Sequence, residues 1–261
     1  NNCTSLKSIV LSENIKTLPI GWVYDPWPLH EHNPYGFFEN CTSLTTTCLP
    51  NSLREIGENA FYRCSRLKSI VLPDSLVKIG NRAFTNCNEI ISIEIPNNVE
   101  IIGEAAFGGT NITSVTIPST VQEIGASAFP ATLTSVVWNA QNCAPTTWTY
   151  SYNSYYGPFA YSAENITSFT IGDGVEYIPS YLCFDMEKIT AITIPNSVKT
   201  IGENAFNGCA SISSVTIPKT IQNIGENAFY SCNSLTKTYY EGSVSDWCNI
   251  RFEGANANTF Q

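Results

Sequence analysis

The sequence has few charged side chains: they make up 13% of its 261 residues, about half the usual ~25% of soluble domains. Lysine and arginine number 13 against 22 acidic residues, which gives a formal net charge of -9 and a pI near 4.7. Because nucleic-acid binding requires clustered basic side chains, and the sequence has no such cluster, we expect no nucleic-acid partner.

Long apolar runs are also missing. No run approaches the roughly 20 residues that cross a membrane, and the first residues show no signal-peptide pattern. We therefore expect no membrane insertion within this chain, and we expect the chain to be part of a longer exported protein whose targeting segment lies elsewhere.

Histidine is scarce, since the sequence contains only His30 and His32. A Ser-His-Asp or Cys-His catalytic apparatus would have to be assembled around these two residues. The sequence has neither a Gly-x-Ser-x-Gly nucleophile elbow nor a phosphate-binding glycine loop. The two histidines and nearby Asp25 allow a weak divalent-metal site, but closely spaced loop histidines are more often incidental. We predict no enzymatic activity, no metal site and no cofactor.

The sequence does contain an internal repeat. Twelve-residue segments such as Pro50–Phe61, Pro73–Phe84, Pro195–Phe206 and Pro218–Phe229 align closely. Each is followed by a Leu/Ile-x-x-Ile/Val-x-Ile/Leu segment. A fixed period of 22–23 residues is typical of solenoids, in which one structural unit stacks on the next. The phenylalanines that mark this period are Phe61, Phe84, Phe107, Phe129, Phe206 and Phe229.

Each repeat position has a physical reason. Ile70 and Leu72 alternate with polar or outward positions, the pattern of a short strand with one buried face. Pro73 ends that strand, because it offers no hydrogen-bond donor. Gly80 is expected where the backbone turns tightly or runs close to its neighbour. We predict an α/β-type repeat solenoid, a right-handed leucine-rich-repeat superhelix of about ten coils with short parallel strands, forming one domain over residues 1–261.

The repeat consensus Ile-Pro-x-Ser-Val-x-x-Ile-Gly-x-x-Ala-Phe-x-x-Cys-x-x-Leu-x-x-Ile resembles the BspA-like (Treponema-type) leucine-rich repeats over nearly the whole chain. The segment from Tyr239 to Ile250 is similar to a closing segment of that family, which places a C-terminal closing segment at about 239–261. The resemblance implies a cell-surface or secreted bacterial or protist protein. Some members are adhesins for host or bacterial proteins, and the resemblance implies no enzyme.

Six of the ten cysteines occupy one repeat position, three residues after the phenylalanine. Free cysteine packs as a small buried hydrophobe, so we predict a column of reduced core thiols. Neighbouring Cα atoms about 5 Å apart would also permit disulfides, which stays an alternative. No Cys-x-x-Cys pair occurs and a column does not converge on one point, so zinc is not expected. Cys48 should face outward. The column consists of Cys3, Cys41, Cys64, Cys87, Cys209 and Cys232.

Two insertions interrupt the repeat, at about 19–36 and 139–160. They combine Trp and Tyr with Ser, Asn and Pro, which is the composition of adaptable binding loops. The alternative is that these aromatic residues anchor the loops to the solenoid. The insertions follow the first and sixth strands, roughly 24 Å apart at ~4.8 Å per strand, so only a large ligand could contact both. The predicted ligand contacts are Trp22, Tyr24, Trp27, Trp138, Trp148, Tyr150, Tyr152, Tyr155 and Tyr156.

The outward strand positions form a flat, neutral surface of short side chains. Such residues suit solvent-facing strands and are compatible with a protein partner. We predict a non-catalytic extracellular or cell-surface binding module whose partner is a host or bacterial surface or matrix protein. Glycan binding through the aromatic insertions and a spacer without a ligand are the alternatives. The outward residues are Ser69, Ser92, Ser114, Ser135, Ser168, Ser214, Thr116, Thr170, Thr193 and Thr216.

Overall fold

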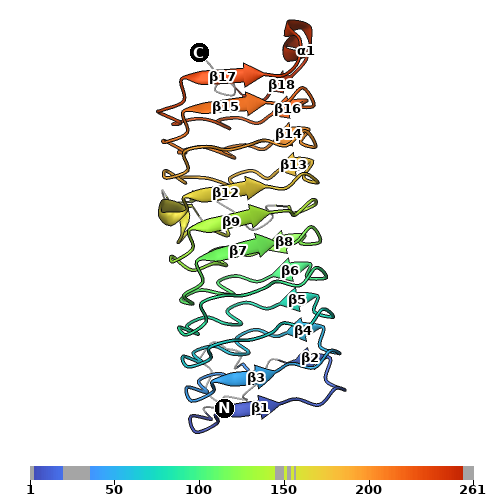
Figure 1. The fold of residues 1–261 in the computed structure, drawn as a ribbon, viewed down its shortest axis with the longest axis vertical. Coiled ribbons are helices and arrows are strands. Elements are labelled where there is room, and N and C mark those ends of the chain that lie inside the picture. Colours follow the sequence, from blue (N-terminus) through green and yellow to red (C-terminus); the bar gives the residue numbers. More distant parts are fainter. Residues whose placement is uncertain (1–2, 20–35, 145–149, 152–153, 156, 255–261) are drawn as a thin grey trace, which may run out of the picture.

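The computed structural model describes residues 3–19, 36–144, 150–151, 154–155 and 157–254. The chain forms an elongated stack of coils, with the N-terminus at one end and the C-terminus at the other (Figure 1). Longer strands run up one side of the stack. They are β1 (Ser8–Val10), β3 (Thr46–Cys48), β7 (Ser114–Ile117), β9 (Ser135–Trp138), β12 (Ser168–Ile171), β15 (Ser214–Ile217) and β17 (Lys237–Tyr240).

A second series consists of two-residue strands on the return path of each coil. These are β2 (Thr17–Leu18), β4 (Glu55–Ile56), β5 (Lys78–Ile79), β6 (Ile101–Ile102), β8 (Glu123–Ile124), β13 (Tyr177–Ile178), β14 (Thr200–Ile201), β16 (Asn223–Ile224) and β18 (Arg251–Phe252). A short antiparallel pair, β10 (Tyr150–Ser151) and β11 (Ser154–Tyr155), lies in the second insertion.

Neighbouring coils pair in parallel and in one register. In the sheet β12-β9-β7, Ser114 pairs with Ser135 and Ser135 with Ser168. The return-path strands form a five-stranded parallel sheet, β2-β4-β5-β6-β8, and a four-stranded one, β13-β14-β16-β18. The predicted repeat solenoid with short parallel strands is therefore confirmed, and the number of coils stays a prediction.

A stack of phenylalanine rings forms the centre of the core. Phe61 and Phe84 are fully buried, and their ring centroids lie 5.4 Å apart with planes 5° from parallel. One ring comes from each coil of the stack except the coil that has Cys183 at this position. A single coil cannot cover its own ring, so the core exists only where coils stack. The stack runs through Phe38, Phe61, Phe84, Phe107, Phe129 and Phe159, and a second stretch pairs Phe206 with Phe229.

The repeat glycine marks a close approach of two backbones. A Cβ atom on Gly80 would lie 2.7 Å from the backbone nitrogen of Glu58 and from the carbonyl carbon of Gly57. Gly80 also donates its N–H to the Ile56 carbonyl oxygen of the preceding coil at 2.8 Å. Glycine is required here because the adjacent backbone leaves no room for a side chain, which is one of the two explanations that the sequence left open.

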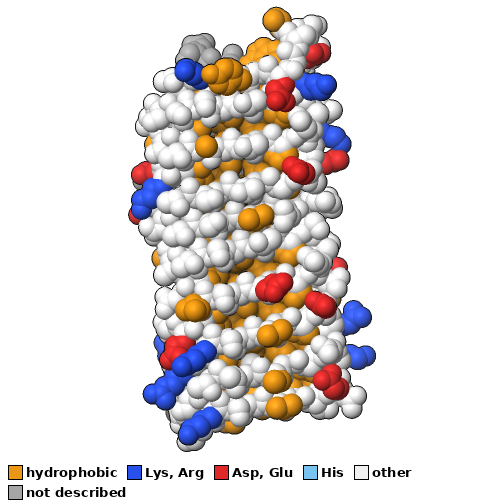
Figure 2. All heavy atoms as spheres, viewed as in Figure 1, with side chains coloured by type: hydrophobic (Ala, Val, Ile, Leu, Met, Phe, Trp, Pro, Cys, Tyr) orange, Lys and Arg blue, Asp and Glu red, His pale blue; other side chains and the backbone are white. Residues whose placement is uncertain are grey.

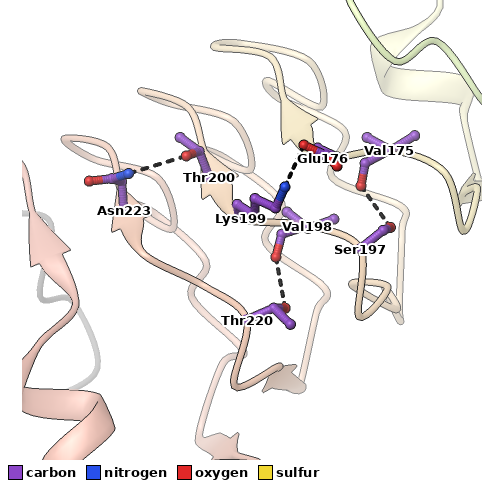
Figure 3. A network of polar contacts seen from close by, with 8 residues as sticks. All are labelled: Val175, Glu176, Ser197, Val198, Lys199, Thr200, Thr220 and Asn223. Atoms are coloured by element: carbon purple, nitrogen blue, oxygen red, sulfur yellow. Dashed lines mark hydrogen bonds and ion pairs between the residues drawn. The ribbon is translucent and has the colours of Figure 1, made fainter.

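Hydroxyl groups connect successive coils at a further repeat position. Ser197 Oγ donates to the carbonyl oxygen of Val175 at 2.7 Å, and Thr220 Oγ1 donates to that of Val198 at 2.8 Å (Figure 3). Ser75 makes the same bond to Leu53 at 2.6 Å. The repeat serine or threonine therefore satisfies a carbonyl of the coil before it, a role that was not predicted from the sequence.

The C-terminal segment packs against the last coils. Helix α1 (Val244–Cys248) follows Ser243, whose side chain forms a capping box with Asp246. The ring centroid of Trp247 lies 5.2 Å from that of Tyr240, with the two rings edge-on, and 5.5 Å from that of Phe252. Strand β18 pairs with β16. Tyr240, Trp247 and Phe252 are partly buried against the hydrophobic core, and the closing role of this segment stays a prediction.

Candidate functional site

The column of cysteines is part of the core. Cys64 donates its thiol hydrogen to the Phe38 carbonyl oxygen at 3.0 Å, and Cys87 donates to that of Phe61 at 3.1 Å. Burial raises the pKa of Cys64 to about 12 and that of Cys232 to about 11. A protonated, buried thiol is not a nucleophile, so these residues hold coils together. Five of the six predicted members are buried: Cys41, Cys64, Cys87, Cys209 and Cys232.

Cys3 and Cys183 differ from these five residues in burial or in position. Cys3 keeps its predicted place in the column beside Cys41, but it is exposed because its coil is at the end of the stack. Cys183 lies outside the column, as predicted, and is fully buried at the phenylalanine position of its coil, where its carbonyl accepts the Cys209 thiol at 3.1 Å. Its spacing of 23 residues from Phe206 was the signal that could have placed it. Cys48 is exposed, as its outward strand position predicts.

Trp138, predicted to contact a ligand, is fully buried. It is the last residue of β9 and points inward like its strand partners Ile117 and Ile171. Its ring lies edge-on to Phe159 at 6.4 Å. Trp138 is therefore a core residue and is not available to a ligand.

The other predicted aromatic contacts lie outside what the structure describes. This holds for the side chains of Tyr150 and Tyr155, whose backbones pair in the β10-β11 hairpin. The remaining predicted residues outside the described ranges are Trp22, Tyr24, Trp27, Trp148, Tyr152 and Tyr156.

The residues that flank the second insertion are hydrogen-bonded into the stack. Asn139 donates its backbone N–H to Ile117 at 3.0 Å, and Ala144 donates to Gln122 at 3.1 Å, so both belong to the stack. The stack resumes at Gly157, whose carbonyl accepts the Ser127 N–H at 2.8 Å. The departure from the repeat is thus confined to the residues between Ala144 and Gly157.

The longer strands and the segments that align with them present one continuous surface, which we call the strand face. Its outward residues form two columns of short side chains. Ser69, Ser92 and Ser114 are exposed in the first column, and Thr116 and Thr170 are exposed in the second. Figure 2 shows this face as mostly uncharged, with charged side chains gathered toward its two margins.

Two grooves indent the strand face. The larger, of about 830 Å³, lies over β7 and β9 and is lined by Ser114, Thr116, Ser135 and Val137 among others. The smaller, of about 560 Å³, lies nearer the N-terminus and is lined by Ser69, Val71, Asp74, Glu94 and their neighbours. Grooves of this size on a flat sheet can receive the side chains of a protein partner.

One outward column of the strand face is apolar in the N-terminal coils. Val10, at the outward position of β1, is 79% exposed, and its strand partner Cys48 is exposed as well. Val71, one coil further, is 81% exposed. Ile91, beside the same face, is 68% exposed. We call Val10, Cys48 and Val71 the apolar column. In the later coils the same column carries Glu94, Thr116, Val137, Thr170, Thr193 and Thr216, and it ends at Tyr239, which is 55% exposed.

The side chains of the ion pairs in the described part of the chain are exposed, and all of these pairs but Arg251–Glu253 link successive coils. The shortest joins Lys199 Nζ to Glu176 at 2.7 Å, with the two side chains 49% and 62% exposed (Figure 3). Pairs this exposed contribute at most about 1 kcal/mol each. Across the described ranges, no three His, Cys, Asp or Glu side chains are arranged to hold a metal ion. None of the helices described there is long and apolar enough to pass through a membrane.

Comparisons with known proteins agree with this architecture. The BspA type leucine rich repeat region matches as six copies over residues 34–136 and 154–261. No curated protein matches the chain. A crystal structure of a leucine-rich repeat protein from Bacteroides ovatus is 21% identical, with a TM-score of 0.51 over 98% of this chain and 76% of that one.

Two further solved structures are similar in part. A leucine rich cell surface protein from Faecalibacterium prausnitzii is 21% identical over 97% of this chain and 78% of its own, with a TM-score of 0.45. The leucine rich repeat protein of T. pallidum is 20% identical over 71% of this chain and 73% of its own, with a TM-score of 0.44.

Proposed function

Because the chain belongs to the family defined by the BspA-type leucine-rich repeat region, we propose that it is a non-catalytic binding module that holds a protein partner on its strand face. Leucine-rich-repeat solenoids are typical protein-interaction modules, and their extended sheets supply large binding surfaces. In this proposal the module works outside the cell or on its surface.

The observation that carries the proposal is the apolar column. Val10 and Val71 are about four-fifths exposed on a strand face whose other outward residues are mainly Ser and Thr. Contiguous exposed apolar side chains bordered by polar ones mark interaction sites. Three adjacent coils carry them, so they form one strip rather than scattered exposed residues.

The charge around the strip favours a particular partner surface. Asp74 and Glu94 line the groove beside Val71, and Glu94 stands next after Val71 in the outward column. Complementary partners meet such a rim with Lys or Arg. The partner is therefore a protein with an apolar patch bordered by basic side chains.

The experiment is a binding screen against purified host matrix proteins, bacterial surface proteins and glycans, measured by biolayer interferometry. The test variant is Val71→Lys, and Thr193→Lys is its matched control, because both positions belong to one outward column. Burying an unpaired ammonium group at an apolar contact should weaken binding more than tenfold. A tenfold loss of affinity corresponds to about 1.4 kcal/mol of binding free energy. We expect such a loss for Val71→Lys and less than a twofold change for Thr193→Lys.

Two results would contradict the proposal. One is a protein ligand that binds both variants as well as the parent chain. The other is that no protein binds, which would favour a spacer without a ligand. A variant in which a short Gly-Ser linker replaces residues 145–156 separates the glycan alternative. The linker is needed because Ala144 and Gly157 bond to Gln122 and Ser127, which lie several residues apart in the preceding coil. A glycan that binds the parent chain and not this variant would move recognition to the insertion.

A further inference from the structure

Aromatic side chains gather at a second place, in the turns that follow the short strands β13, β14 and β16. A cavity of about 410 Å³ lies there, within the ~300–1,000 Å³ range of small-ligand sites. None of its lining residues belongs to the two insertions. It is lined by Tyr181, Phe184, Asp185, Asn204, Asn207, Asn227 and Tyr230.

The composition of this cavity is peculiar to three coils. Its residues come from the position two before the core phenylalanine and the two positions after it. In the N-terminal coils the position directly after the phenylalanine carries Tyr62, Thr85 and Gly108. In the three coils that line the cavity it carries Phe184, Asn207 and Tyr230. Each of these coils already has its core ring or Cys183. Phe184 is buried next to Cys183, whereas Tyr230 is 49% exposed, so stacking does not require the Tyr230 ring.

Tyr181 lies in a turn whose left-handed backbone recurs along the stack. Its φ is 61°, and the corresponding residues of other coils have φ values of 50–55°: Asn59, Arg82, Ala105, Ser127, Asn204 and Asn227. The conformation is therefore a property of the repeat turn, and three successive coils place this residue in the lining of the cavity. The Tyr181 ring lies 5.7 Å from that of Phe184, and both line the cavity.

A hydrogen-bonded network supplies the polar part of the lining. Tyr181 Oη donates to Glu203 Oε1 at 3.1 Å, and Asn204 Nδ2 donates to the same oxygen at 2.9 Å. Asn207 Nδ2 then donates to Asn204 Oδ1 at 2.7 Å. The network holds these side chains in place, and each amide has both a carbonyl oxygen and an NH₂ group with which to bond hydroxyls.

The charge of the cavity excludes anionic ligands. Asp185 lies against Gly208, where an added Cβ would meet its Oδ1 atom. Burial, and after it the carboxylates of Glu187 and Glu164, raises the pKa of Asp185. No lysine or arginine lines the cavity, so a phosphate, sulfate or carboxylate ligand would find no cation.

We propose that this cavity binds a neutral hexose unit of a glycan. The aromatic face of Tyr230, which is 49% exposed, would pack on the C–H face of the sugar ring, as amphipathic rings do. Phe184, which is 8% exposed, would form part of the cavity wall. Asn207, Asn227 and Asp185 would bond its hydroxyl groups. The site is separate from the strand face, so the module would have a sugar site in addition to its protein-binding surface, and the two can fail independently.

The test is a titration of the whole chain with methyl hexopyranosides and their N-acetyl derivatives, followed by saturation-transfer NMR and calorimetry. Tyr230→Ala is the test variant, because Tyr230 is 49% exposed and its removal leaves the core intact. Tyr62→Ala is the matched control, since Tyr62 holds the same repeat position in an earlier coil. Asn207→Ala is a second variant that removes a hydrogen-bonding group instead of a ring.

We expect at least one glycoside to bind with a Kd of about 1 mM or tighter. Tyr230→Ala and Asn207→Ala should each weaken this binding about tenfold, and Tyr62→Ala by less than twofold. The proposal is overturned if no glycoside binds, if Tyr62→Ala weakens binding as much as Tyr230→Ala, or if choline binds and the glycosides do not. The last result would show an aromatic cation site in place of a sugar site.

Discussion

Substituting Gly80 by alanine should loosen the stack at one interface between coils. The new Cβ would lie 2.7 Å from two backbone atoms of the preceding coil. Moving it to an ordinary contact of about 3.4 Å requires a shift of about 0.7 Å (3.4 minus 2.7). Backbone atoms of a paired strand have no rotamer with which to move aside, so the two coils must separate.

The magnitude follows from what the shift disturbs. The Gly80 N–H to Ile56 O bond, 2.8 Å long, would lengthen to about 3.5 Å, beyond the range of a good hydrogen bond. Losing one such bond costs about 1 kcal/mol, and forced repacking around an added methyl costs about 1–3 kcal/mol. The free energy of unfolding should fall by about 2–4 kcal/mol, which corresponds to a drop in Tm of about 4–16 °C for a chain of this size.

Gly108→Ala is the matched control. Gly108 is buried too, but a Cβ atom there would lie 3.3 Å from the Ala105 carbonyl oxygen and 3.7 Å from its next neighbours. We expect its free energy of unfolding to change by less than about 1 kcal/mol, because replacing glycine also reduces the entropy of the unfolded chain. Denaturant titration and calorimetry measure both variants. Equal losses in the two would refute the argument that close backbone approach fixes Gly80.

Three further predictions concern polar groups and thiols inside the stack. Thr47→Val should raise Tm, because the buried Thr47 hydroxyl has no hydrogen-bond partner and such a group costs about 1–3 kcal/mol; a lower Tm would contradict this. Ser75→Ala should lower the free energy of unfolding by about 1 kcal/mol by removing one coil-to-coil bond, and no change in a thermal melt would show the bond to be dispensable. The part of the stability that depends on these thiols should be constant well below pH 9 and fall above it, because the unfolded thiols ionise near 9.0 while Cys64 and Cys232 hold their protons to about 12 and 11. Each such thiol costs about 1 kcal/mol by pH 10. Denaturation midpoints at pH 8 and pH 10 test this, and Cys64→Ala should reduce the difference between the two midpoints. A thiol reagent at pH 8 should modify Cys48 and leave Cys64 unmodified until the chain unfolds.

The repeat could be predicted from the sequence because each position does one physical task in every coil. Phe84 stacks, Gly80 makes room, and the strand residues alternate between inside and outside, so their spacing alone gives the fold. The same reasoning would have placed Trp138 correctly. It is the last residue of its strand, in line with Ile117 and Ile171, and that register requires burial whatever the residue type. Its nearness to an insertion was the weaker signal.

Cys183 shows that register decides burial whatever the residue type. It was correctly predicted to lie outside the column, but its burial at the phenylalanine position was not predicted. In the structure the chain tolerates a thiol in the place of a ring, and the position three residues later carries the buried Met186. A larger side chain there accompanies the smaller one at Cys183. Register fixes which positions are buried, and volume is then shared among neighbours.

The insertions resist prediction for the opposite reason: no repeat register constrains them, and their composition allows either packing or recognition. The turns are a different case. Tyr181, Asn207 and Tyr230 are spaced so that stacking brings them together, but the left-handed backbone of the turn decides which side chains line the cavity. Recognition therefore need not be confined to irregular segments. Stacking fixes the inward residues of each coil and leaves its turn positions free to vary, so a regular solenoid can build a binding site from equivalent positions of adjacent coils.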